Sequence, residues 1–196
     1  MDVLRAASWT LLVLSWLGFA GLLARNHYRV RAERLRQGIP EEKPALRDPR
    51  SMHGLILEGL AFCIAFFVQR SAMDTAPWQY LASMAFGMLS VAVLAAALRH
   101  LGMEWRIKAV VTEDHQLITS GPYRVIRHPI FGALLALLVA TALIVSATWA
   151  AWLALGVYLV GTEIRIKAED GLLERRFGKL YADYRMRTPA YVPFLR

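Results

Sequence analysis

The apolar run PIFGALLALLVATALIVSATWAAWLALGVYLVG, residues 129–161, decides how many helices this chain is expected to form. A helix crosses a bilayer with about 20 apolar residues, so the run is too long for one crossing and short for two. Its least apolar point is the tetrapeptide SATW, residues 146–149. We therefore expect the run to divide there into a tight hairpin of two helices.

Three further apolar blocks precede this run. They cover residues 6–24, 54–68 and 78–98, and the second of them contains one acid, Glu58. With 57% hydrophobic residues, the chain of 196 residues is too apolar for an ordinary soluble domain of this size. The sequence predicts an all-α integral membrane protein with about five transmembrane helices, followed by a C-terminal helical region on the cytoplasmic side.

The distribution of basic residues tests the count of five helices. Residues 25–50, 99–127 and 165–196 contain eight, five and eight Lys and Arg, and only Arg5 and Arg70 of the 23 lie elsewhere. Five crossings place the three basic segments on one side, whereas four crossings would move the last segment to the other. Because basic loops favour the cytoplasmic side, we expect the N-terminus outside and the C-terminus inside. The same alternation explains the net charge of +8 better than nucleic-acid binding does.

The segments between and after the apolar blocks show weaker patterns. Residues 25–50 indicate a short amphipathic helix on the lipid headgroups, broken at GIP, residues 38–40. Residues 110–112 and 117–119 indicate two short extended pieces around a turn. After the fifth helix we expect the chain to continue as helix to about Pro189, and its aromatic tail to fold back onto an apolar surface. The apolar stripe of that helix consists of Leu172, Leu173, Phe177 and Leu180.

Several other kinds of segment and site lack support in the sequence. The first apolar block is long for a signal peptide and no A-x-A-like site follows it, so we expect no cleavage. The single cysteine, Cys63, excludes a disulfide within the chain and a CxxC metal site, and we expect no metal. No GxGxxG, P-loop, HExxH or GxSxG motif occurs, which argues against a soluble Rossmann-type methyltransferase or dehydrogenase.

Polar residues at the expected cytoplasmic helix ends are the candidates for a site. His128 stands at the N-terminus of the fourth helix, where free N–H groups and the helix dipole favour an anion; headgroup anchoring would explain it and Arg127 equally. Arg165 and Glu169 are four residues apart and share a helix face, which also suits an exposed ion pair. Placing the carboxylate of Glu58 inside a membrane has a high free-energy cost. Glu58 therefore either belongs to the site or snorkels to the membrane edge.

Two longer motifs occur in a fixed order. HQLITSGPYRVIRHPIFG, residues 115–132, is followed after the expected hairpin by RIKAEDGLLERRFGKLYADY, residues 165–184, and a tail that contains proline. Together they resemble the isoprenylcysteine carboxyl methyltransferase family. The resemblance covers about residues 99–196, the expected catalytic region, while residues 1–98 are expected to form three transmembrane helices and a basic loop. Because the superfamily includes phospholipid and thiol methyltransferases, the motifs do not identify the acceptor.

The resemblance implies S-adenosylmethionine as the cofactor and assigns roles to individual residues. Arg165 would face the carboxylate of the methyl acceptor. Two positions depart from the family pattern, since Phe131 replaces the usual tyrosine and Asp170 shortens the usual second glutamate. The cofactor contacts that the motifs imply are His115, Gln116, Leu117, Ile118, Tyr123, His128, Pro129, Ile130, Phe131 and Glu169.

The chemistry of these residues suits that cofactor. S-adenosylmethionine carries a carboxylate, which His128 and the helix N-terminus would hold, and an ammonium, with which Glu169 would pair. An acceptor carboxylate is already ionised at pH 7, so in-line methyl transfer needs no general base. Catalysis would then depend mostly on positioning, with Arg165 holding the acceptor.

We therefore expect a membrane methyltransferase that uses S-adenosylmethionine and acts on the carboxylate of an isoprenylcysteine-like acceptor, either a lipophilic small molecule or a lipidated peptide. The first alternative is N-methylation of a phospholipid or S-methylation of a thiol. Arg165 would then have no acceptor carboxylate to bind. Membrane reductases share a similar C-terminal pattern, but five helices make this chain too short for that comparison. The alternative without catalysis is a membrane scaffold whose basic segments bind anionic lipid.

Overall fold

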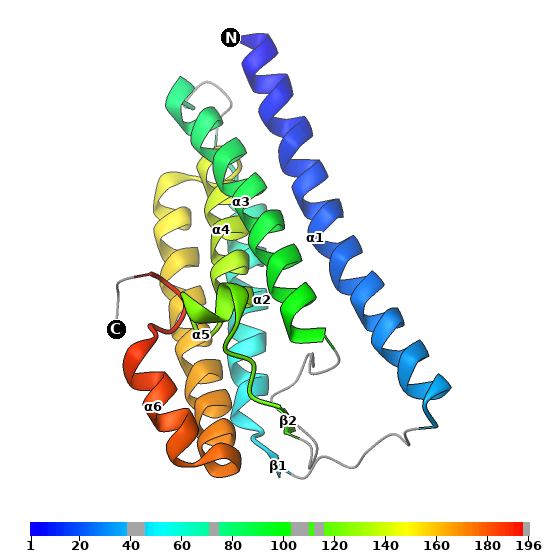
Figure 1. The fold of residues 1–196 in the computed structure, drawn as a ribbon. Coiled ribbons are helices and arrows are strands. Elements are labelled where there is room, and N and C mark those ends of the chain that lie inside the picture. Colours follow the sequence, from blue (N-terminus) through cyan, green and yellow to red (C-terminus); the bar gives the residue numbers. More distant parts are fainter. Residues whose placement is uncertain (39–45, 71–74, 103–109, 112–115, 194–196) are drawn as a thin grey trace.

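Helix α4 (Pro129–Ile144) lies at the centre of a bundle formed by the other long helices (Figure 1). The computed structural model describes residues 1–38, 46–70, 75–102, 110–111 and 116–193. The other elements in chain order are α1 (Asp2–Arg36), β1 (Leu46–Arg47), α2 (Arg50–Phe67), α3 (Pro77–Leu101), β2 (Val110–Val111), the 3-10 helix η3 (Gly121–Arg124), α5 (Thr148–Phe177) and α6 (Lys179–Arg187). The described part of the chain is thus mainly helical, as the all-α prediction requires.

Among the described residues, four helices are long and apolar enough to cross a membrane, namely α1, α2, α3 and α5. Helix α4 has 16 residues and is shorter than a typical crossing helix. The expected hairpin is confirmed, since α4 ends at Ile144 and α5 begins at Thr148. A helical membrane fold is therefore confirmed, whereas the count of five crossings and the orientation across the membrane stay predictions.

Apolar side chains pack against α4 from two sides. Toward α1 and α3, Leu137 lies in a buried cluster with Phe19 and Leu94. Toward α2 and α5, Leu138 lies in a second buried cluster with Tyr158. Two serines of α3 also donate hydrogen bonds of 2.7 Å to backbone carbonyls of α4. Because protein surrounds α4 on these sides, the helix is a core element of the bundle despite its short length.

Helices α2 and α5 approach so closely that glycine is required on both. A Cβ atom at Gly54 would overlap the carbonyl oxygen of Gly161, and one at Gly161 would lie 2.7 Å from the carbonyl oxygen of Gly54. Small residues at such crossings let membrane helices pack backbone to backbone. Glu58 and Arg165 each follow one of these glycines by four residues, and this close approach brings them together.

Helix α1 continues without interruption from Asp2 to Arg36. The prediction of a separate amphipathic helix from residue 25 is therefore wrong, because residues 25–36 extend the membrane helix. This stretch has neither glycine nor proline, and eight of its twelve residues are Arg, Ala, Glu or Leu, which favour helix. The helix ends before Gly38, whose φ of 64° lies in the left-handed region that favours glycine, so the predicted break is confirmed.

The extended piece at Val110–Val111 pairs with a segment that lies much earlier in the chain. It forms an antiparallel pair with Leu46–Arg47, in which Leu46 lies opposite Val111. Residues 117–119 are described and form no strand, so of the two predicted extended pieces only the first is a strand. A sequence pattern can indicate an extended segment, but a segment of two residues carries too little pattern to specify its partner.

The C-terminal helical region is divided at Gly178. This glycine has a φ of 53° and separates α5 from α6, so the prediction of one continuous helix is wrong. The break changes the face that the following residues present. Leu172 is buried as expected, whereas Leu180 is exposed and Tyr181 is buried in its place.

The C-terminal tail returns to the segment that precedes α4. The N–H groups of Arg127 and His128 donate to the carbonyls of Pro189 and Ala190 at 2.9 and 2.8 Å. The prediction that the tail folds back is therefore confirmed, and the tail holds His128 at the start of α4.

Candidate functional site

Three helices and a turn meet where α5 continues toward α6. Glu58 comes from α2, His128 from the turn before α4, Phe131 from α4, and Arg165 and Glu169 from α5. The sequence identifies four of these five residues as site candidates. For Glu58 it leaves two interpretations, a site residue or a side chain that snorkels to the membrane edge. The fold brings all five into one connected group.

Glu58 is buried between α2 and α5, with 3% of its surface exposed. Its Oε2 atom lies 2.6 Å from Nη1 of Arg165, and its Oε1 atom accepts a hydrogen bond of 3.1 Å from Thr162. Arg165 itself is only 8% exposed. A buried charge is stable only when another charge compensates it, so this pair holds both side chains in place. The snorkelling interpretation is wrong, and Glu58 belongs to the candidate site.

The guanidinium of Arg165 also contacts two other residues of the site. Its Nη2 atom lies 3.8 Å from Oε1 of Glu169, and its Cζ atom lies 4.4 Å from the centre of the Phe131 ring. The second distance is typical of a cation–π interaction, which uses the ring face and needs no hydroxyl. Arg165 is therefore part of a buried cluster, and the interpretation of an exposed ion pair with Glu169 is wrong.

His128 is held between two carboxylates of α5. Its Nε2 atom lies 2.8 Å from Oδ1 of Asp170, and its Nδ1 atom lies 3.3 Å from Oε2 of Glu169. The ring stacks on Phe131 with 5.5 Å between centroids. Burial alone would lower the pKa of His128, but the hydrogen bonds to Asp170 and Glu169 raise it to about 9. The imidazole is therefore positively charged at neutral pH, and its burial argues against headgroup anchoring.

The first turn of α4 offers fewer donors for an anion than the sequence suggests. Pro129 has no N–H, and the N–H groups of Phe131 and Gly132 donate to the carbonyl of His128 at 3.1 and 3.3 Å. An anion bound at this helix end would therefore rely mainly on the charged His128 ring.

Asp170 connects His128 to the C-terminal tail. It accepts a hydrogen bond from the hydroxyl of Tyr181, and its Oδ2 atom lies 3.1 Å from Nη2 of Arg127. Arg127 also donates to the carbonyl of Thr188 in the tail. The headgroup-anchoring interpretation is therefore wrong for Arg127, which ties the tail to α5. Asp170, which departs from the family pattern, therefore holds the His128 ring through its Nε2 atom.

Tyr123 is buried beside the same site. Burial raises the pKa of its hydroxyl, and the nearby charge of Glu169 raises it further. The turn that carries Tyr123 requires glycine, because Gly121 has a φ of 59° and a Cβ atom there would overlap the ring of His100. The GPY sequence therefore directs Tyr123 into the protein next to Glu169.

The other implied cofactor contacts are less closely associated with this group. His115 lies outside the described residues. Gln116 is exposed, and Leu117 and Ile118 are partly buried in the irregular segment before η3. Ile130 packs into the apolar cluster formed with α1 and α3. The structure therefore does not bring the four described positions, Gln116, Leu117, Ile118 and Ile130, into the ionic group.

Sequence reasoning missed three partners in the site. Thr162 precedes Arg165 by three residues, so their shared helix face was a signal that could have identified it. Asp170 was noted only as a departure from the family, and Tyr181 was missed because the helix break at Gly178 changes which residues face inward. Glu58 was recognised as unusual, but its partner was not identified.

A sequence model of the isoprenylcysteine carboxyl methyltransferase (ICMT) family matches residues 83–175. The nickel-cobalt-cadmium resistance protein NccN of Alcaligenes xylosoxydans xylosoxydans is 34% identical over 110 residues, which are 55% of this chain and 51% of that protein. Protein-S-isoprenylcysteine O-methyltransferase B of Arabidopsis thaliana is 34% identical over 90 residues, 45% of each chain. The cobalt-zinc-cadmium resistance protein CzcN of Cupriavidus metallidurans is 34% identical over 110 residues, 55% of this chain and 50% of that protein.

The chain spans about half the length of the curated relatives it matches. Within the described ranges, no group of three or more His, Cys, Asp or Glu is arranged to hold a metal ion. The family match includes His128, Phe131, Arg165 and Glu169, so it coincides with most of the site, while Glu58 lies outside it. The resemblance carried by the two motifs is confirmed by this match, and residues 83–175 of the chain are similar to the ICMT family.

Proposed function

We propose that the chain is an integral membrane methyltransferase that moves a methyl group from S-adenosylmethionine to a lipophilic acceptor. The observation that carries this proposal is a continuous series of contacts from Glu58 through Arg165 and Glu169 to His128. The series runs from a membrane-spanning helix to a helix end, which suits a site where a water-soluble cofactor meets a membrane-bound acceptor. The distribution of basic residues supports a cytoplasmic position for it.

The charges in the site fit S-adenosylmethionine. Glu169 has a side chain that is 25% exposed, against 4% for Glu58 and 6% for Asp170. Its contacts with His128 and Arg165, at 3.3 and 3.8 Å, are also longer than the 2.8 Å contact between His128 and Asp170. An ammonium group can replace such loose contacts while Asp170 keeps His128 in place.

The bound cofactor would supply the methyl group as an electrophile on its sulfonium. Glu169 would pair with the cofactor ammonium and the positive His128 ring with its carboxylate. These two residues lie on different elements, and so they would bind the two charged ends of the amino-acid part separately. Tyr123, buried beside Glu169, would cover the same region from the loop side.

Arg165 is the residue that we assign to the acceptor. Glu58 engages Nη1 at 2.6 Å, and a guanidinium has five N–H donors, so a second carboxylate can bind along another edge. The contacts with Glu58 and Phe131 fix the guanidinium, which provides the positioning that a reaction without a general base requires. The carboxylate of an isoprenylcysteine-like molecule is therefore our first candidate acceptor.

The contact with Glu58 also favours a second candidate. The buried pair of Glu58 and Arg165 is neutral as a unit, so it attracts an acceptor carboxylate less than an uncompensated arginine would. A thiol or the amine of a phospholipid headgroup needs no positive partner. The two candidates thus differ in whether Arg165 holds the acceptor.

Methyl transfer by the purified protein in nanodiscs distinguishes these candidates. Wild-type protein and Arg165→Lys would be given labelled S-adenosylmethionine with a prenylated cysteine analogue, phosphatidylethanolamine or a long-chain thiol. If Arg165 holds a carboxylate, lysine cannot replace its two parallel bonds, and turnover of the prenylated cysteine falls about a hundredfold. Binding of S-adenosylhomocysteine should remain near normal.

Each other outcome has a defined meaning. Equal turnover of the prenylated cysteine by both proteins would reject Arg165 as the carboxylate ligand. Preference for the thiol or the amine would favour the second candidate. No transfer to any of the three acceptors would contradict a methyltransferase of this kind.

A further inference from the structure

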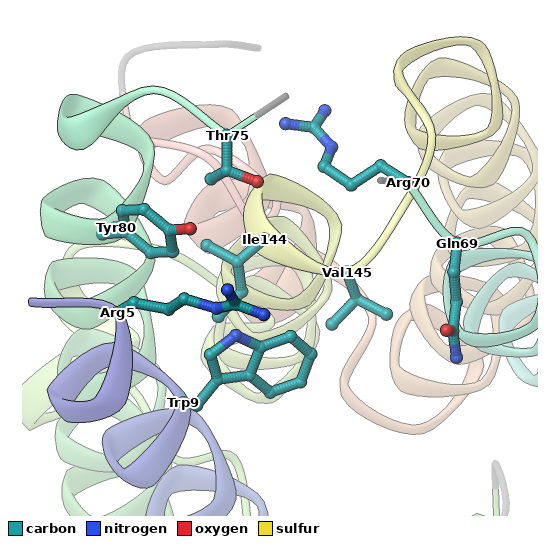
Figure 2. Close-up of a pocket in the computed structure, with 8 residues that line it drawn as sticks. All are labelled: Arg5, Trp9, Gln69, Arg70, Thr75, Tyr80, Ile144 and Val145. Atoms are coloured by element: carbon teal, nitrogen blue, oxygen red, sulfur yellow. The ribbon is translucent and has the colours of Figure 1, made fainter. Parts of the chain in front are cut away.

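A pocket lies at the opposite end of the bundle from the candidate site, beside the turn between α4 and α5 (Figure 2). Its lining comes from α1, the segment after α2, α3 and the end of α4. Its volume is about 180 Å³, well above the roughly 10–15 Å³ that one water needs and below the roughly 300 Å³ of the smallest drug-sized pockets. The pocket therefore suits a small polar group better than a whole lipid molecule.

Two arginines from different elements line this pocket. They are Arg5 and Arg70, the two basic residues that lie outside the three basic segments of the sequence. Arg70 is fixed by hydrogen bonds to the carbonyl of Ser146 at 2.7 Å and the hydroxyl of Thr148 at 3.3 Å. None of the described residues that line the pocket is acidic. Two positive charges thus converge on one small space, which favours an anion.

The depth of the pocket in the membrane follows from the length of α1. Arg5 and Arg25 stand at the two ends of its apolar block, 20 residues apart. That separation is about 30 Å along a helix, the thickness of the hydrocarbon layer. When Arg25 lies at one headgroup level, Arg5 lies at the other.

Exposed tryptophans mark the same level on three helices. Trp9 lies near the start of α1, and Trp78 and Trp149 lie in the first turns of α3 and α5. Figure 1 shows the starts of α1 and α3 at the same end of the bundle. Tryptophan is enriched where a membrane protein meets the interface, so this end of the bundle lies at the depth of the lipid phosphates.

We propose that this pocket binds the phosphate group of a membrane phospholipid. Figure 2 shows Arg5 entering from α1 above the ring of Trp9, and Arg70 entering from the other side. Arginine matches a phosphate because its planar guanidinium can donate two parallel hydrogen bonds. Ile144 supplies an apolar wall against which the glycerol carbons can pack, while the acyl chains stay in the surrounding lipid.

The chemistry separates this ligand from other lipids. A diacylglycerol has the same chains but no anion, so it should not occupy the pocket. Inorganic phosphate has the same anionic group but no acyl chains. The acyl chains keep the phosphate of a phospholipid at the membrane and so raise its local concentration at the pocket. The proposal does not depend on methyl transfer, because neither arginine belongs to the candidate site.

Native mass spectrometry of the full chain released from detergent tests the proposal. The probes are phosphatidylglycerol, a diacylglycerol with the same chains, and inorganic phosphate. We expect one phosphatidylglycerol to remain bound, and Arg5→Gln to weaken its binding by about ten- to a hundredfold, the range for a lost hydrogen bond to a charged group. Arg5 is exposed, so this change should leave the fold intact.

Arg25→Gln is the matched control, because it removes an exposed headgroup-level cation from the same helix but not from the pocket. We expect it to leave the tightest bound phosphatidylglycerol in place. Equal losses in Arg5→Gln and Arg25→Gln would overturn the proposal, and so would equal binding of the diacylglycerol. Full displacement of the lipid by an equimolar amount of inorganic phosphate would assign the pocket to a free anion instead.

Discussion

Two ionic clusters adjoin along α5 and are assembled in different ways. The helix cluster consists of Glu58, Thr162 and Arg165. The tail cluster consists of Arg127, His128, Asp170 and Tyr181. The helix cluster forms where α2 and α5 pack against each other, and the tail cluster forms where the C-terminal tail returns to the start of α4. Glu169 contacts one residue of each.

The difference lies in the number of partners that share each charge, because the charged side chains of both clusters are similarly buried. In the helix cluster, one carboxylate compensates a guanidinium at 2.6 Å, between two helices that are long and apolar enough to cross a membrane. In the tail cluster, Asp170 accepts from His128, Tyr181 and Arg127 together. Loss of one group should therefore be more damaging in the helix cluster, where fewer partners share the charge.

The largest effect is expected from Glu58→Ala. This change removes the carboxylate from a buried arginine and should lower the free energy of unfolding by about 3–5 kcal/mol. Unfolding by SDS in mixed micelles measures it. The matched control is the double variant Glu58→Ala with Arg165→Met, which removes both charges and should recover much of the stability. A single variant as stable as wild type would show that the pair is not energetically coupled.

The tail cluster should make stability depend on pH through His128. Its pKa is about 9 in the folded protein, against 6.5 as its ordinary value. The folded state therefore binds the proton more tightly. The stabilisation is fully present below about pH 6.5 and is lost as the pH rises through about 9, with a magnitude on the order of 3 kcal/mol. Thermal unfolding between pH 6 and 10 measures this decline.

His128→Gln should flatten the decline between pH 6.5 and 9. His53→Gln, which changes an exposed histidine at the start of α2, should leave it unchanged. An unaltered pH profile in His128→Gln would show that another group titrates, and the assignment of a charged His128 would then fail.

The smallest of these effects compares two neighbouring tyrosines of α6. Tyr181→Phe removes a hydrogen bond to the carboxylate of Asp170, which should cost about 1.5–3 kcal/mol. Tyr184→Phe removes a hydrogen bond to the carbonyl of Tyr123, a neutral acceptor, and should cost about 0.5–1.5 kcal/mol. Thermal unfolding of both variants measures the difference. A reversed order would mean that the other partners of Asp170 fully replace Tyr181.

Local patterns predicted part of the site from the sequence. The weak point at residues 146–149 located the turn between α4 and α5, and the spacing of four residues placed Arg165 and Glu169 on one face. The motif around His128 located the start of α4. These features depend on residues close together in the chain, which is why periodicity and turn signals were sufficient for them.

Features that depend on distant residues could not be predicted in this way. Glu58 and Arg165 are 107 positions apart, and they meet only because Gly54 and Gly161 let two helices touch. The contribution of Glu58 also crosses the predicted boundary at residue 98, so the site uses both parts of the chain. Tyr181 enters the tail cluster because Gly178 breaks the helix, which a continuous apolar stripe does not reveal.

Calorimetric titration of the purified protein with S-adenosylhomocysteine tests the central claim most directly. We expect wild-type protein to bind it, and Glu169→Gln to bind about tenfold more weakly or worse, because the charge-assisted contact with the ammonium is lost. Glu174→Gln, which changes an exposed carboxylate on the same helix, should bind as wild type does. Absence of binding to folded wild-type protein, or unchanged affinity in folded Glu169→Gln, would contradict a cofactor site at the meeting point of the two clusters.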